Sequence, residues 1–306
     1  MIGSFLNVCI SRLPAGESVV HPRSRCPGCG TQIAWYDNIP VLSWLLLRAR
    51  CRSCGTRISA LYPVVELATA LLWMLAFAAF GPTFFALRVA VFATVMLGIA
   101  VTDAREFLIP DGFTLFGLGW VLGTALVVFL VGGMPAGDGA VGSWLAQEDG
   151  RFASIGQAVL GACAGAGAVA ITGWLGEVAL KREAMGFGDL TLMAVVGAAV
   201  GPVRALLTVF VGAVLAVLAL PLLRIMTRAQ ARPNSTAPDL VLPGPAGSAP
   251  IPAAADDANV VQADTADSRG HIPFGVFLAP AALIVLLWGD ALIRGYLRWI
   301  YTGMLG

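Results

Sequence analysis

Long runs of apolar residues, separated by short polar stretches, are the feature of this sequence that most limits its possible folds. A helix that crosses a bilayer needs about 20 mostly apolar residues, because each residue adds about 1.5 Å and the hydrocarbon core is about 30 Å thick. By this criterion the runs predict helices near residues 63–80, 85–102, 112–132, 154–178, 190–201, 203–223 and 274–293. We therefore expect a polytopic helical membrane protein.

The composition agrees with lipid as the main solvent of the chain. Of the 306 residues, 58% are hydrophobic and only 12% are charged, whereas about 25% of the residues in a soluble domain are charged. The 19 Lys and Arg residues nearly balance the 18 Asp and Glu residues, giving a formal net charge of +1. A water-soluble fold is excluded, and no overall field favours nucleic acid as a partner.

The first and the shortest apolar runs need separate interpretation. Residues 1–10 are apolar but make only half a span, so we read them as the end of a first helix whose beginning lies upstream; a short interfacial helix is the alternative. Gly201 and Pro202 end the short run 190–201 and predict a tight hairpin to the next helix. The predicted fold class is an all-α bundle of about eight segments, the first one partial.

Basic residues indicate the orientation of these segments, since Lys and Arg stay in cytoplasmic loops. The loop before residue 63 carries seven arginines, and alternation from there places fourteen of the 19 basic residues on the same side. We expect these domains: 1–11, a partial first transmembrane helix; 12–61, a cytoplasmic cysteine-containing domain; 62–226, a transmembrane core; 227–271, a disordered cytoplasmic loop; and 272–306, the last transmembrane helix and tail. A Gly-rich stretch at 133–153 is expected to be a solvated outer loop.

Four cysteines in the first loop form two Cys-x-x-Cys pairs about twenty residues apart, a spacing typical of a zinc ribbon or knuckle. The ligands would be Cys26, Cys29, Cys51 and Cys54. Gly28, Gly30 and Gly55 are expected to supply the turn conformations that these loops need. Disulfides are the alternative, but a cytoplasmic loop is reducing, which favours zinc. Since thiolates would fill all four positions, the predicted zinc is structural.

Two aspartates near membrane depth are candidates for catalysis, because ionisable groups there are costly. Asp103 follows the run 85–102, and Asp189 precedes the run 190–201, which places both at the cytoplasmic face. Two close carboxyls share a proton and can activate a water for peptide hydrolysis. Asp103 at a helix C-terminus would be the protonated member, and Asp189 at an N-terminus would be the base. Asp111 is a second candidate, although Pro110-Asp111 can instead start a helix.

Glycines flank Asp189 in Gly186-Phe187-Gly188-Asp189. A backbone without side chains lets an extended substrate strand approach closely, so Gly186 and Gly188 are expected beside the substrate. Turn chemistry alone is the competing explanation for both glycines.

Taken together, several motifs in order make the chain resemble the type IV prepilin peptidases, the leader peptidases/N-methyltransferases of type IV pilus and type II secretion systems. The motifs are Gly3-Ser4-Phe5-Leu6-Asn7-Val8 with Arg12-Leu13-Pro14, the two cysteine pairs, Trp35-Tyr36-Asp37-Asn38-Ile39-Pro40 with Leu42-Ser43-Trp44, Ile58-Ser59, Tyr62-Pro63-Val64-Val65-Glu66-Leu67, Asp103 with Ile109-Pro110-Asp111, Gly186-Phe187-Gly188-Asp189, and Ile272-Pro273-Phe274-Gly275. The chain departs from the family at Val276, where proline is common.

The resemblance implies an intramembrane aspartic peptidase of the G-x-G-D type with Asp103 and Asp189 as its pair, in a bacterial inner membrane. Its substrates would be prepilins or pseudopilins, cut after a glycine before their hydrophobic helix. Bifunctional members then methylate the new N-terminus with S-adenosylmethionine, for which Glu66 is a suspected contact. Two alternatives stay open: a peptidase without methylation, and a non-enzymatic scaffold or transporter that uses the aspartates as an ion site.

Overall fold

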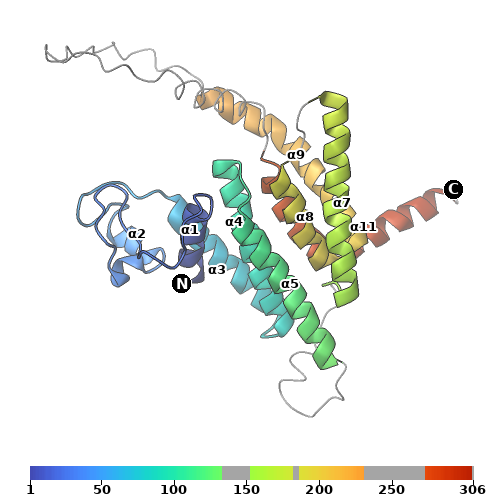
Figure 1. Cartoon of the computed structure of the whole chain (residues 1–306), viewed down its shortest axis with the longest axis horizontal. Helices are drawn as coiled ribbons and strands as arrows, with labels where there is room; N and C mark the ends of the chain where they lie inside the picture. Colours follow the sequence, from blue (N-terminus) through green and yellow to red (C-terminus); the bar gives the residue numbers. More distant parts are fainter. Residues whose placement is uncertain (133–151, 182–185, 231–272, 305–306) are drawn as a thin grey trace. The chain divides into compact units, whose positions relative to one another are not determined.

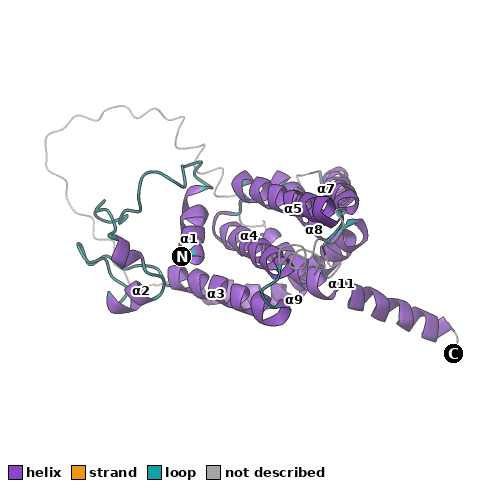
Figure 2. Cartoon of the chain, turned by 90° about the horizontal axis from the view of Figure 1, so that it is seen from below, coloured by secondary structure: helices purple, strands orange, loops and turns teal. Residues whose placement is uncertain are grey.

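The computed structural model describes residues 1–132, 152–181, 186–230 and 273–304; helices dominate this part of the chain, and loops make up most of the segment between residues 13 and 60 (Figure 2). Within these ranges no strand is formed, and the extended pairing is confined to two isolated bridges, Arg25 with Gln32 and Arg50 with Arg57. The chain divides into two compact units, Met1–Leu215 with Pro273–Gly306, and Ala216–Ile272. Of the second unit, the structure describes the end of one helix.

Eight helices of the described residues correspond to the eight expected segments (Figure 1). They are α1 (Ile2–Arg12), α3 (Leu61–Phe80), α4 (Phe84–Glu106), α5 (Asp111–Gly132), α7 (Ile155–Leu180), α8 (Phe187–Val200), α9 (Pro202–Gln230) and α11 (Gly275–Met304). Six of them are long and apolar enough to cross a membrane, whereas α1 and α8 are shorter. The prediction of an all-α bundle is confirmed.

The helix ends follow from identifiable residues. Thr83 caps α4 by accepting a hydrogen bond from the Ala86 amide at 3.1 Å. Phe107 ends the same helix in the left-handed conformation, with φ 52°. Gly201 has φ 83°, and Pro202 is the first residue of α9, so the expected tight turn between α8 and α9 is present.

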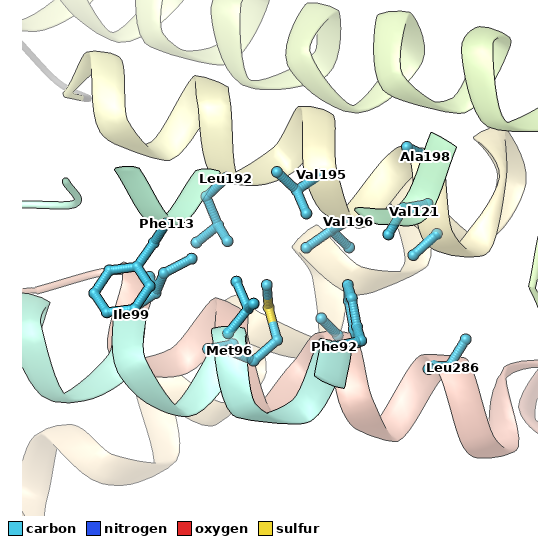
Figure 3. Packing of buried hydrophobic residues seen from close by; sticks show 14 of the residues in the cluster. Phe92, Met96, Ile99, Phe113, Val121, Leu192, Val195, Val196, Ala198 and Leu286 are labelled. Carbon is cyan, nitrogen blue, oxygen red and sulfur yellow. The ribbon is translucent and has the colours of Figure 1, made fainter. Parts of the chain in front are cut away.

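The interior of the first unit lies between α4, α5, α8 and α11 (Figure 3). Ile99 of α4 and Leu192 of α8 are fully buried, and Phe113 of α5 lies beside them. The helices α7 and α8 pack so closely that a Cβ placed on Gly197 would lie 2.0 Å from the Gly161 carbonyl oxygen. Small residues thus let two backbones meet.

The first helix packs antiparallel to α3. The Asn7 side-chain amide donates to the Tyr62 carbonyl at 3.0 Å, and a Cβ on Gly3 would lie 2.8 Å from the Glu66 Cα. Leu6, Cys9 and Ile10 are buried in the main core. The expected first segment, α1, therefore packs into the helix bundle through its buried residues.

Three expected boundaries need correction. α9 continues to Gln230, so the first residues of the loop expected at 227–271 are helical, and the remainder of that loop from residue 231 lies outside the described residues. α11 continues to Met304, well past the expected end of its apolar run at 293. Phe152 and Ala153, assigned to a solvated loop, are buried, and the Ala153 amide donates to the Ala199 carbonyl at 2.8 Å.

Candidate active site and metal site

Asp103 lies in the last turn of α4 and is 5% exposed. Its Oδ2 accepts a hydrogen bond from the Val276 amide at 3.0 Å, in the first turn of α11. A Cβ placed on Gly275 would lie 2.8 Å from the same oxygen, so a side chain there would collide with the carboxylate. The start of α11, 173 residues away in the sequence, is therefore built around Asp103.

This contact changes the electrostatic argument about the two aspartates. The sequence predicts that the dipole at the C-terminus of its own helix dominates the electrostatics of Asp103. In the structure its carboxylate also accepts a hydrogen bond from the Val276 amide at the N-terminus of α11. Asp189 lies in the first turn of α8. Because helix N-termini favour negative charge, helix position no longer distinguishes the general base from the protonated partner.

Ile109 connects the surroundings of the two aspartates. A Cβ placed on Gly275, beside Asp103, would lie 3.0 Å from the Ile109 Cδ1, and one placed on Gly188 would lie 2.8 Å from the Ile109 Cβ. Gly188 directly precedes Asp189. One turn further into the bundle, Ile99 of α4 and Leu192 of α8 share the same core (Figure 3). The C-terminus of α4, which carries Asp103, and the N-terminus of α8, which carries Asp189, thus both lie close to Ile109 at one end of the bundle.

The other residues of the expected site have different surroundings. The space above Gly188 is taken by Ile109, whereas Gly186 faces open space with only the Gly188 amide at 4.0 Å. Asp111 begins α5 and is exposed, consistent with a helix-starting role. Gly275 and Val276 were not given a role from the sequence; their motif was visible, but no local pattern indicates that it meets Asp103.

The four cysteines of the two pairs converge. Their sulfur atoms all lie within 4.8 Å of one another, and the Sγ atoms of Cys26 and Cys54 are 3.7 Å apart. In a tetrahedral zinc site with Zn–S bonds of about 2.3 Å, the sulfurs lie about 3.8 Å apart. The group Cys26, Cys29, Cys51 and Cys54 can therefore hold a metal ion, and the spacing suits four thiolates around one centre.

An internal repeat that extends beyond the cysteine spacing explains this convergence. Residues 26–33 and 51–58 both read Cys-x-x-Cys-Gly-Thr-x-Ile. In each repeat the first cysteine's amide donates to the threonine carbonyl, at 2.9 Å for Cys26 and 2.8 Å for Cys51. Gly30 and Gly55 have φ of 68° and 71° as expected. Gly28 differs, because it has no positive φ; a Cβ there would lie 2.6 Å from the Thr56 Oγ1.

The surroundings favour the thiolate form of two of the cysteines. Hydrogen bonds from the Thr56 side chain and backbone lower the pKa of Cys54 to about 6. Hydrogen bonds from the backbone amides of Cys54 and Ser53 lower the pKa of Cys51. Since a metal binds the thiolate, the lowered pKa values favour Cys51 and Cys54 as metal ligands.

Polar contacts attach the cysteine-containing segment to the bundle. The Glu66 Oε2 accepts from the Val41 amide at 2.8 Å, and the Ser4 hydroxyl lies 3.4 Å from the Asn38 Oδ1. Within the segment, Arg52 donates two hydrogen bonds to Asp37, at 2.8 and 2.6 Å, and lowers the pKa of that carboxyl. Glu66, suspected of contacting a cofactor, thus has a structural partner.

Comparisons with known proteins agree with this geometry. Residues 1–80 match the model of the bacterial peptidase A24 N-terminal domain, and residues 90–221 match the type IV leader peptidase family. The chain is 35% identical to a prepilin leader peptidase/N-methyltransferase of Myxococcus xanthus, covering 96% of this chain and 89% of that protein. Proteins of the same description from Aeromonas hydrophila and Pseudomonas aeruginosa are 33% and 31% identical, each covering 97% of this chain and 90% of the relative.

A multi-pass membrane peptidase is the class that the helices and these matches define. The chain belongs to the type IV leader peptidase family. No solved structure matches it.

Proposed function

We propose that this protein removes the leader from prepilins or pseudopilins, using Asp103 and Asp189 as a pair, at the cytoplasmic face of a bacterial inner membrane. The observation that supports the proposal is that Ile109 lies against both Gly275, beside Asp103, and Gly188, directly before Asp189, while the Asp103 carboxylate accepts from the Val276 amide. The family match and the printed names of the relatives support the same activity.

The chemistry follows from two carboxyls that share one proton. The ionised carboxylate takes a proton from water, whose oxygen attacks the scissile carbonyl, while the protonated carboxyl hydrogen-bonds to that carbonyl. The tetrahedral intermediate collapses as the C–N bond breaks, and the leaving nitrogen takes the proton that the first carboxylate had removed from water, which restores the singly protonated pair. A substrate whose apolar helix lies in the bilayer would present the bond at the depth of this helix end. Gly186, with open space above it, is proposed to let the substrate backbone approach.

The cytoplasmic placement is supported by the charge pattern. The loop between α1 and α3 carries most of the arginines of the N-terminal quarter. This loop begins beside the start of α5, since a Cβ on Gly112 would lie 2.8 Å from the Leu13 side chain. Basic loops remain cytoplasmic. The pair Asp103 and Asp189 then lies at the cytoplasmic interface.

We further propose that the four cysteines bind structural zinc, and that methylation of the new N-terminus by S-adenosylmethionine follows cleavage. The first part is supported by the convergence of the four sulfurs. The second is supported by the relatives' name, and no described residue is assigned to that cofactor. Zinc would hold together a segment too small to build its own core. The proposed domains include the cysteine-containing domain at 12–61 and a peptidase core that begins at residue 62, with the boundary expected after residue 226 moved to Gln230, where α9 ends.

The peptidase proposal is tested by leader removal from a prepilin in membranes. Asp103→Asn and Asp189→Asn should each abolish cleavage, while Asp111→Asn, an exposed carboxyl on the neighbouring helix start, should cleave normally. Full leader removal by either of the first two variants would reject the mechanism.

Two further measurements test the associated activities. The mass of the mature pilin N-terminus should increase by one methyl group, and a mature N-terminus without it would leave a peptidase only. Metal analysis of the purified chain should give one zinc, which Cys26→Ser and Cys54→Ser should remove.

A further inference from the structure

The short helix α2 (Leu42–Leu46) presents an apolar face outward and a polar residue inward. Leu42, Leu45 and Leu46 are 50%, 59% and 73% exposed. Their spacing of i, i+3 and i+4 places them on one side of the helix. Ser43 is buried instead, and its hydroxyl donates to the Tyr36 carbonyl at 2.8 Å. This pattern is the reverse of that on a helix at the surface of a water-soluble domain.

The position of α2 relative to the membrane-spanning helices is defined by Glu66. Its carboxylate accepts from the amide of Val41, the residue directly before α2. Glu66 is the sixth residue of α3, whose apolar span starts at Leu61. The hydrogen bond therefore places the start of α2 close to the first turns of α3, at the end where the apolar span begins.

The first turns of α3 also carry exposed apolar side chains. Val64 and Leu67 of α3, on either side of Glu66 in the sequence, are each 56% exposed. At the other end of α2, Arg48 and Arg50 are exposed. Leucines followed by arginines suit the boundary between acyl chains and anionic headgroups.

We infer that α2 is a membrane-surface contact: its three leucines enter the acyl region near the start of α3, and Arg48 and Arg50 lie at the lipid phosphates. The partner is the bilayer of the cell membrane itself, and the contact holds the cysteine-containing segment against it. The inference rests on the chain being a membrane protein and is independent of the proposed peptidase chemistry.

The inference is tested by photo-crosslinking of the full chain in vesicles of phosphatidylethanolamine and phosphatidylglycerol. Benzoylphenylalanine is placed at Leu46, at Leu67 as the lipid-facing control, and at Ser53, an exposed polar position between Cys51 and Cys54. After irradiation, intact mass should rise by one phospholipid for the Leu46 and Leu67 variants and should not change for the Ser53 variant.

Three results would overturn the inference. The first is a Leu46 variant without a lipid adduct while the Leu67 variant forms one. The second is a Leu46 crosslink to another protein chain, which would assign the face to a second copy or a soluble partner. The third is an equal lipid yield from Ser53, which would show that the contact is not specific to α2. Zinc content and the melting temperature of each variant establish that the chain is folded.

Discussion

Gly275 is the position where one added methyl group would test the arrangement around Asp103 most directly. A Cβ there would lie 2.8 Å from the Asp103 Oδ2 and 3.0 Å from the Ile109 Cδ1. Ordinary van der Waals contact begins at 3.4 Å, so the carboxylate must retreat by the difference, 0.6 Å, or the start of α11 must move. Either movement lengthens the 3.0 Å hydrogen bond from Val276.

We expect Gly275→Ala to slow leader removal roughly tenfold, because a misplacement of about 1 Å costs about 100-fold in rate. The loss should fall on kcat and leave KM nearly unchanged, since the methyl group displaces a reacting group rather than the substrate. The assay is a time course of cleavage of a purified prepilin in lipid nanodiscs, at several substrate concentrations.

Gly295→Ala is the matched control, because it adds the same methyl group to the same helix in open space. It should cleave at the wild-type rate. Thermal unfolding of both variants separates a local effect from a loss of folded protein. A folded Gly275→Ala enzyme with wild-type kcat would refute the conclusion that the start of α11 positions Asp103.

Two further outcomes follow from the structure. In metal-free protein, iodoacetamide should alkylate Cys54 rapidly at pH 7, and the reaction should be lost as the pH falls through about 6, because hydrogen bonds from Thr56 lower the Cys54 pKa to about 6 and only the thiolate reacts. Peptide mass mapping measures the alkylation, and added zinc should block it. An alkylation rate at pH 7 no higher than that of Cys26 would contradict the prediction. Gly197→Ala should destabilise the protein by about 1–3 kcal/mol or more, because its Cβ would collide with the Gly161 carbonyl oxygen of α7. Its melting temperature should be lower than that of Gly167→Ala, which adds a methyl group in open space. Equal melting temperatures would disprove the close packing of α7 and α8.

The helices could be predicted because apolar runs record which residues avoid water. The turn at Gly201 and Pro202 was equally readable, since both residues restrict the backbone locally. The end of α11 could not be predicted from hydropathy, which indicates only the part of a helix that fits the lipid core. The helix continues past Arg294 to Met304, beyond its apolar run. Helical hydrogen bonding does not stop where hydrophobicity does.

The site was only partly predictable. Counting the membrane crossings was enough to predict that Asp103 and Asp189 lie on the same side of the membrane, because each loop must lie on one of its two sides. The contact of Asp103 with Val276 depends on side-by-side packing of α4 and α11, which no local pattern encodes. The expected difference in charge between the aspartates was argued from each residue's own helix. It stays a prediction, because the N-terminus of α11 also donates to Asp103 and helix position alone does not decide it.

The hydrogen bond between Val276 and Asp103 also has a consequence for the order of events during synthesis. The ribosome makes α4 long before α11, so the emerging chain carries the Asp103 carboxyl without its amide donor until the last helix has been inserted. The arrangement proposed for catalysis is therefore completed only after α11 has joined α4. A nascent enzyme would therefore acquire its activity only when α11 is inserted beside the helices that precede it in the sequence.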